Sequence, residues 1–151
     1  MDDIRTVLLT TDFSDTSTKA FAPALTLARR FGAKILLVYI EEDRLPPLVI
    51  EYMAVGVEEI LSQQRDLAGE RLKDLVGERF GDDVEVEPVV TMGTPHTEIV
   101  RLADERGADL IVMATHGRGF ISHAILGSTA ERVLRRSPCP VLIVREPAGS
   151  D

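Results

Sequence analysis

The sequence predicts a single α/β domain built on a doubly wound parallel sheet, and three observations lead to this prediction. Apolar runs alternate along the chain with segments whose apolar residues recur every three or four positions, in the order strand, helix, strand. The run at 34–40 is apolar on both faces, as expected for a strand covered by helices on both sides. The 151 residues contain no internal repeat and no long linker. We therefore expect one domain over residues 1–146 and a flexible tail over 147–151.

The first strand and the first helix follow directly from the N-terminal pattern. Residues 6–10 (TVLLT) form a short apolar run with β-branched residues, which is followed by a cluster of helix-capping side chains. Apolar residues at helical spacing then predict a helix that begins at Ser14 or Asp15 and ends at Phe31. Gly32 suits the position after a helix, where the backbone is often left-handed.

Two strands and a long helix are predicted for the middle of the chain. Residues 34–40 (KILLVYI) form the second strand. After the prolines at 46–47, a helical rhythm of apolar residues predicts a long helix that continues almost to Phe80, with an irregular first turn. Residues 84–90 (VEVEPVV) alternate in polarity and contain Pro88, which predicts an edge strand.

The C-terminal half continues the same alternation. Thr94 is placed to cap a helix with Pro95 in its first position, and Gly107 is placed to end that helix. The remaining predicted elements are, in order, a strand at 110–114 (LIVMA), a loop at 115–127 with glycines, a helix at 128–136 and a strand at 141–144 (VLIV).

Composition excludes several classes of function. The 25 acidic and 17 basic residues give a formal charge of −8, which repels polyanions and argues against nucleic-acid binding. No apolar run approaches the roughly 20 residues that span a bilayer. The N-terminal MDDIR is acidic and leads into a strand instead of a signal-peptide core. We therefore expect a cytoplasmic protein without a membrane or nucleic-acid partner.

The stretch 111–144 carries the main chemical signal. It places a loop with glycines between a strand and a helix start, and this order is typical of anion sites. A helix N-terminus offers unpaired N–H groups and a positive partial charge of about half a unit, and glycine lets a phosphate approach the backbone. Ligands of doubly wound sheets bind beyond the carboxyl ends of strands, so residues 10–14 after the first strand belong to the same edge. The sequence thus predicts a phosphate-bearing ligand.

Motifs of other phosphate sites and of hydrolases are missing. There is no G-x-x-x-x-G-K-[ST] segment, and Gly117, Gly119 and Ser122 lack the last glycine of G-x-G-x-x-G. Neither a G-x-S-x-G segment nor a zinc-ligand spacing is present, and no metal ligand can be assigned. Catalysis through a protein nucleophile is therefore not predicted.

The segment ATHG at 114–117, nine residues, and GST at 127–129 together resemble the universal stress protein family, in which G-x-x-G, nine residues, G-[S/T] wraps the phosphates and ribose of ATP. The resemblance covers the whole chain, with further matching words at 11–14 (TDFS), 116–118 (HGR), 126–128 (LGS), 130–134 (AERVL) and 137–142 (SPCPVL). It implies a five-stranded, Rossmann-like sheet of the adenine nucleotide alpha-hydrolase type. Its implied strand order is 3-2-1-4-5, which makes the first and fourth strands neighbours.

The resemblance also implies a ligand and the residues that hold it. The ligand is ATP with Mg²⁺; Asp12 would contact the adenine or ribose end, and the backbone of Ile40 would meet the adenine. The full implied set of nucleotide-binding residues is Thr10, Thr11, Asp12, Ile40, Met113, Ala114, His116, Gly117, Arg118, Gly127, Ser128 and Thr129. The one departure is Ala114, where the ATP-binding pattern has its first glycine.

Alternatives to this interpretation stay open at this point. Asp12 could cap the first helix, and Gly127 with Ser128 could serve only as a loop end and a helix cap. The function implied by the resemblance is a dimeric, nucleotide-dependent stress-response or regulatory module. A relative that does not hold ATP and works as a protein-interaction module is the second reading, and a slow ATPase is the third.

The last strand adds an expectation about assembly. In the implied order it lies at an edge of the sheet, and an uncovered apolar edge invites pairing with another chain. A two-fold dimer through Val141, Leu142, Ile143 and Val144 is the simplest solution, and the family resemblance implies the same.

Overall fold

The computed structural model describes residues 3–42, 47–52, 56–115 and 126–145. Five parallel strands form one sheet in the order β3-β2-β1-β4-β5, which confirms the expected fold class and strand order. The strands are β1 (Thr6–Thr10), β2 (Lys34–Glu41), β3 (Val86–Met92), β4 (Leu110–Ala114) and β5 (Val141–Val144). The predicted tail at 147–151 lies outside the described residues.

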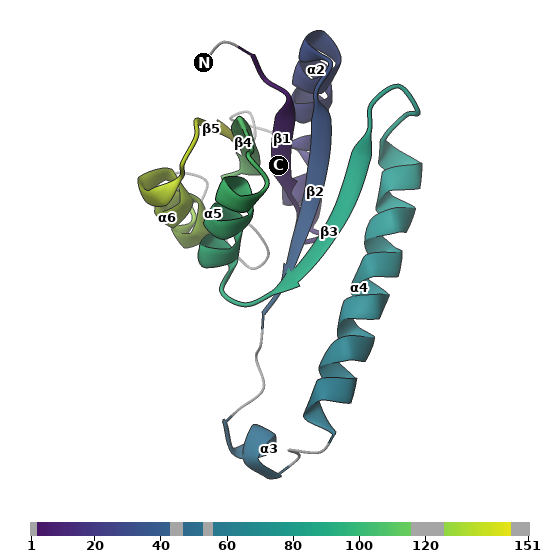
Figure 1. Cartoon of the computed structure of the whole chain (residues 1–151), viewed down its shortest axis with the longest axis vertical. Helices are drawn as coiled ribbons and strands as arrows, with labels where there is room; N and C mark the ends of the chain where they lie inside the picture. Colours follow the sequence, from purple (N-terminus) through teal and green to yellow (C-terminus); the bar gives the residue numbers. More distant parts are fainter. Residues whose placement is uncertain (1–2, 43–46, 53–55, 116–125, 146–151) are drawn as a thin grey trace.

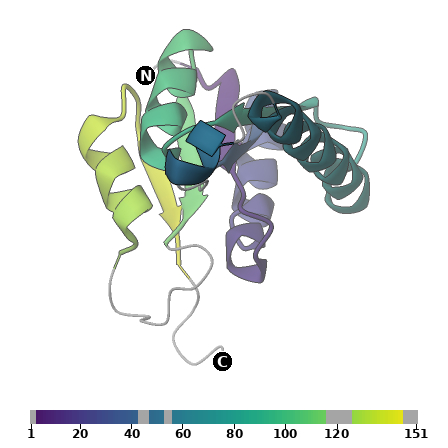
Figure 2. The same cartoon turned by 90° about the horizontal axis from the view of Figure 1, so that it is seen from below.

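Helices cover both faces of this sheet. One face carries α1 (Asp15–Thr18), α2 (Phe21–Phe31) and α4 (Val57–Arg79), and the other carries α5 (Pro95–Glu105) and α6 (Ser128–Arg136) (Figures 1 and 2). The short α3 (Pro47–Tyr52) lies beyond the carboxyl ends of β2 and β3, next to the projecting start of α4 (Figure 1). No helix in the described ranges is long and apolar enough to cross a membrane.

Two apolar layers hold the sheet between its helices. Successive side chains of a strand point to opposite faces, so Val7 and Leu9 join one layer and Leu8 joins the other. Each fully buried leucine contributes roughly 1.5–3 kcal/mol relative to an exposed one. The layer under α2 and α4 includes Phe21, Ala24, Ile35, Leu37 and Leu72, and the layer under α5 and α6 includes Leu36, Ile99, Leu102, Ile111 and Val133.

Two helices that were predicted as continuous are each divided into two in the structure. The first predicted helix is divided into α1 and α2, because the N–H of Lys19 bonds to Thr16 O and that of Ala20 to Ser17 O, which tightens the chain before α2 starts at Phe21. The buried Ala20 then packs in the core. The second predicted helix likewise consists of two helices, α3 and α4, in the described ranges.

The predicted strands, and the glycines predicted to follow helices, agree more closely with the structure. Strands β1, β4 and β5 and helix α6 have the predicted bounds, whereas β3 starts and ends two residues later and β2 continues to Glu41. The edge position of β3 is confirmed. Gly32 and Gly107 follow their helices with φ values of 65° and 62°, the left-handed backbone that favours glycine. Thr94 occupies the cap position of α5, but its side chain makes no capping hydrogen bond.

Candidate functional site

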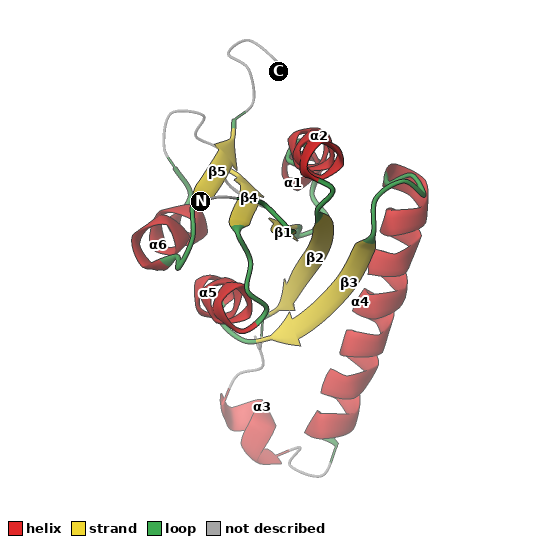
Figure 3. Cartoon of the chain, turned by 45° about the horizontal axis from the view of Figure 1, so that its top comes forward, coloured by secondary structure: helices red, strands yellow, loops and turns green. Residues whose placement is uncertain are grey.

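The sheet brings the two predicted site segments together. β1 pairs with β4 in parallel, with Leu9 opposite Val112, so residues 11–14, which follow β1, leave the sheet beside the end of β4. At that end, the Gly127 N–H donates to the Thr115 carbonyl at 2.8 Å, which places the start of α6 next to the end of β4 (Figure 3). The candidate site therefore has one half after β1 and one half after β4.

The first half is a turn held by its own side chains. The N–H of Thr11 donates to Val38 O at 3.0 Å, and the buried Thr11 hydroxyl lies 2.9 Å from the Ser17 hydroxyl and accepts from Phe13 N at 3.1 Å. Asp12 Oδ1 accepts from Ser14 N at 2.9 Å and from the Ser14 hydroxyl in a short bond. The turn is therefore fixed before any ligand arrives.

Asp12 does not cap the first helix, so that alternative is wrong. The N-cap of α1 is Ser14, whose Oγ accepts from Ser17 N at 3.1 Å. Asp12 instead fixes Ser14 through its Oδ1. Asp12 therefore acts in this turn by holding Ser14, which in turn caps α1.

Phe13 adds a strained position that the sequence gives no signal for. It is the one non-glycine residue with positive φ in the described ranges, at 66°. Left-handed backbone costs roughly 1–2 kcal/mol for a residue with a Cβ. The ring lies 4.6 Å from the Tyr39 ring, and the Arg71 guanidinium of α4 lies 4.1 Å from the Phe13 ring centre. These contacts offset the strain and tie the turn to β2 and α4.

The remaining strand-end residues differ in exposure. Ile40, near the end of β2, is half-buried and packs on the core layer beneath α5 and α6. Met113 and Ala114 are buried at the end of β4, and Ala114 pairs with Val144 of β5. The backbone of Ala114 does not adopt positive φ. Alanine in place of the expected glycine thus fits a regular strand.

The second half of the site is an open helix start. Gly127 is the N-cap of α6, with extended backbone at φ −61° and ψ 152°, and it provides no capping side chain. Ser128, which the sequence marks as a candidate cap, is instead the exposed first helical residue. Thr129 is half-buried. The N–H groups of the first helical turn have no partner within the helix, so this start is suited to an anion.

Three predicted site residues, His116, Gly117 and Arg118, lie outside the described residues. In the described part of the chain, no three His, Cys, Asp or Glu side chains gather in a way that could hold a metal ion.

Cys139 offers no nucleophile. It is a free, half-buried thiol before β5, and its N–H donates to the Ser137 hydroxyl at 3.2 Å. Burial raises the pKa of the thiol, with a smaller contribution from Asp109, so the thiol is protonated at neutral pH. Cys139 is therefore not an activated nucleophile.

Comparison with known proteins agrees with this geometry. The model of the universal stress protein family matches residues 3–145. Universal stress protein MJ0531 of Methanocaldococcus jannaschii is 33% identical over 142 residues, which cover 93% of this chain and 82% of that protein. The solved structure of MJ0577, also from M. jannaschii, has a TM-score of 0.77 at 26% identity and covers 97% of this chain and 99% of that one.

A further solved relative is a universal stress protein in complex with cAMP. It is 29% identical with a TM-score of 0.62, and the alignment covers 97% of this chain and 100% of that one. The match to the family extends over both halves of the candidate site and over all five strands. The chain belongs to the universal stress protein family.

Proposed function

We propose that this universal stress protein binds ATP with Mg²⁺ at the shared edge of β1 and β4 and acts in the cytoplasm as a dimeric, nucleotide-dependent stress-response or regulatory module. The observation that carries the proposal is the open start of α6, where the N-cap Gly127 is hydrogen-bonded to Thr115 beside the turn that holds Asp12. One half provides donors for phosphate, and the other provides a carboxylate for sugar hydroxyls.

Each group of the nucleotide has a complementary part of the site. The N–H groups at the start of α6, together with the Ser128 and Thr129 hydroxyls, would bind phosphate oxygens. Asp12 would accept hydrogen bonds from the ribose, and the backbone at Ile40 would meet the adenine. Mg²⁺ is commonly bound by nucleotide phosphates with few protein ligands.

The expected affinity is modest. About four hydrogen bonds to charged oxygens at roughly 2 kcal/mol each give about −8 kcal/mol, the free energy of micromolar binding. Ordering of the ligand and of the binding residues reduces this sum. The universal stress protein solved with cAMP supports an adenine nucleotide as the ligand class.

A direct test is to denature the purified protein, identify any released nucleotide, and titrate ATP into wild type and into Asp12→Ala. We expect an adenine nucleotide or micromolar ATP binding that Asp12→Ala weakens. Neither bound nucleotide nor measurable affinity would reject the nucleotide proposal and leave the protein-interaction module. Turnover to ADP that the substitution abolishes would establish a slow ATPase instead.

The dimer proposal rests on the free edge of β5. Leu142 is 37% exposed on this strand, and among the described residues β5 pairs only with β4. We expect Leu142→Glu to give a monomer by light scattering, because it places a charge in the paired edge. Leu67→Glu, at the 71% exposed Leu67 of α4, is the matched control and should leave the mass unchanged. A dimer in the Leu142 variant would contradict pairing through β5.

A further inference from the structure

We propose that the side of α6 next to α5 is a docking surface for a carboxylate-rich segment of a partner protein, bound mainly by Arg132 and Arg136. We call this surface the α6 basic face; it consists of Arg132 and Arg136 of α6 and His96 of α5. It does not depend on the nucleotide proposal, because none of these residues belongs to the two half-sites.

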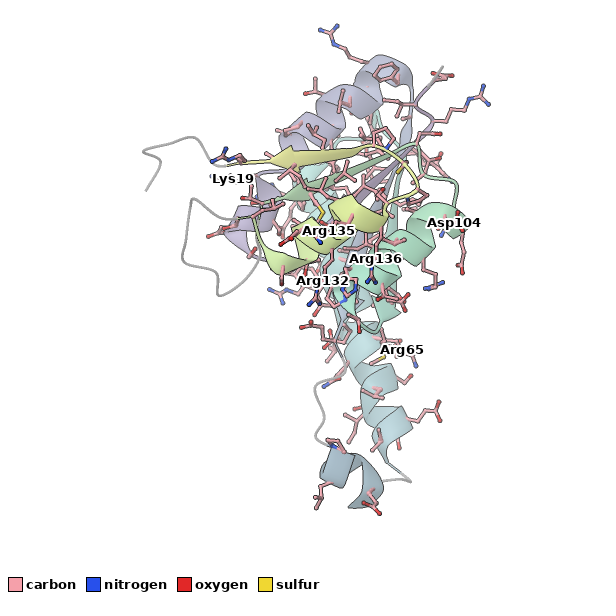
Figure 4. All side chains as sticks on the ribbon, turned by 90° about the vertical axis from the view of Figure 1, so that its left-hand side faces the viewer. Lys19, Arg65, Asp104, Arg132, Arg135 and Arg136 are labelled. Carbon is pink, nitrogen blue, oxygen red and sulfur yellow. The ribbon has the colours of Figure 1, made fainter. Side chains whose placement is uncertain are left out.

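The α6 basic face is set by helical spacing. Arg132 and Arg136 are four residues apart on α6, which places them on one side of the helix about 6 Å apart along its axis. Both are exposed, and Figure 4 shows them close to one another where α6 runs beside α5. The half-buried His96, in the first turn of α5, lies within reach of both charges: its pKa is lowered by burial first, then by Arg132 and Arg136.

Neither arginine has a carboxylate partner in the described part of the chain, whereas several other arginines do. Their neighbour Arg135 bonds to Glu131 at 2.8 Å. Elsewhere Arg106 bonds to Glu87 at 2.6 Å, and Arg29 bonds to Asp83 at 2.6 Å. In a chain with a net charge of −8, two adjacent cations without an internal counter-charge form a local positive surface.

The chemistry of the α6 basic face selects its partner. A guanidinium presents a planar fork that matches a carboxylate in a two-point hydrogen bond. Two carboxylates one helical turn apart, or two residues apart on an extended strand at about 6.6–6.8 Å, match the spacing of the two arginines. The overall negative charge disfavours a long polyanion such as nucleic acid, but a short acidic segment is repelled less.

Lys19 and Arg65 provide a matched control. Figure 4 shows both away from the α6 basic face, with Lys19 just after α1 and Arg65 on α4, and neither has an ion-pair partner in the described ranges. Lys19→Gln with Arg65→Gln removes the same two charges as Arg132→Gln with Arg136→Gln. The comparison separates a local surface from the effect of net charge.

The test measures fluorescence anisotropy of a labelled helical peptide with glutamates four residues apart, at low and at high salt, against a glutamine version of the same peptide. We expect wild type and the control variant to bind the glutamate peptide alike, and Arg132→Gln with Arg136→Gln to bind it about tenfold more weakly. Equal losses in both variants, or equal binding of the glutamine peptide, would overturn the proposal. An oligonucleotide that binds more tightly than the peptide with the same arginine dependence would overturn it as well.

A second readout follows the His96 ring by NMR. The glutamate peptide should raise the pKa of His96, since it brings negative charge to the α6 basic face, and the double arginine variant should raise that pKa without peptide. A pKa of His96 that responds to neither change would contradict the placement of the peptide. Thermal unfolding confirms that each variant is folded before these comparisons.

Discussion

The two halves of the candidate site differ in how their polar groups are hydrogen-bonded. In the turn after β1, Asp12 holds Ser14, and the buried Thr11 bonds to Ser17. The start of α6 begins at Gly127, which provides no capping side chain. One half is therefore preorganised and strained at Phe13, whereas the other leaves backbone donors for a ligand. Substitutions in the first half should therefore disturb folding, and binding as well where Asp12 is changed, whereas substitutions at the start of α6 should disturb mainly binding.

The largest effect is expected from a substitution in the second half of the site. Gly127→Val places a branched side chain at the buried N-cap of α6, where a phosphate must approach the backbone. We expect ATP affinity by calorimetry to fall by about tenfold to a hundredfold, equivalent to the loss of one or two charge-assisted hydrogen bonds. Gly69→Val on α4, where an added Cβ meets no atom within 4 Å, is the control and should bind ATP as wild type does. Equal affinity of both variants would contradict the role of Gly127.

Asp12 in the first half combines two roles, because it holds Ser14 in the folded turn and is proposed to bind the nucleotide. Asp12→Ala removes the acceptor for Ser14 and should lower the free energy of unfolding by about 1–2 kcal/mol and ATP affinity by about tenfold. Asp12→Asn keeps an Oδ1 acceptor, so denaturant unfolding should stay close to wild type while ATP affinity still falls. If Asn restored both quantities, the charge of Asp12 would have no part in binding.

Phe13 tests the strain assigned to the first half. Phe13→Ala and Phe13→Gly both lose the contacts with Tyr39 and Arg71, but only alanine keeps a Cβ at φ 66°. We expect the glycine variant to be more stable than the alanine variant by about 1 kcal/mol in urea unfolding. The reverse order would mean that the positive φ carries no cost here.

The smallest expected effect concerns the one departure from the family pattern. Ala114 is a buried strand residue paired with Val144, and its backbone needs no glycine. Ala114→Gly should therefore change ATP affinity by less than about threefold and lower stability by about 0.5–1 kcal/mol, since glycine loses more backbone entropy. A tenfold gain in affinity, measured by the same calorimetry, would mean that the Ala114 methyl obstructs the nucleotide.

Much of the fold can be predicted from the sequence because its signals are local. β4 and β5 are apolar runs bounded by turn residues, and both strands have the predicted bounds. The break between α1 and α2 does have a sequence signal, because Pro23 lacks the N–H that a continuous helix would bond to the Lys19 carbonyl and is tolerated only in the first turn of a helix.

Parts of the candidate site can likewise be predicted from the sequence, and other parts cannot. The sequence predicts that residues 10–14 and 127–129 belong to one edge, and the pairing of β1 with β4 brings the two segments together there. The positive φ of Phe13 has no local signature, because it depends on Tyr39 and Arg71 from other elements. Gly127 and Ser128 are both common cap residues, so only the backbone decides that Gly127 is the cap.

The most direct test of a nucleotide site at the β1 and β4 edge is an NMR titration of the labelled protein with ATP and Mg²⁺. We expect saturable shifts of the backbone amides of Ser128, Thr129 and Ala130 together with those of residues 12–14, at micromolar concentrations. Shifts confined to one half, or located at other elements such as α4, would contradict a nucleotide site formed by the two strand ends.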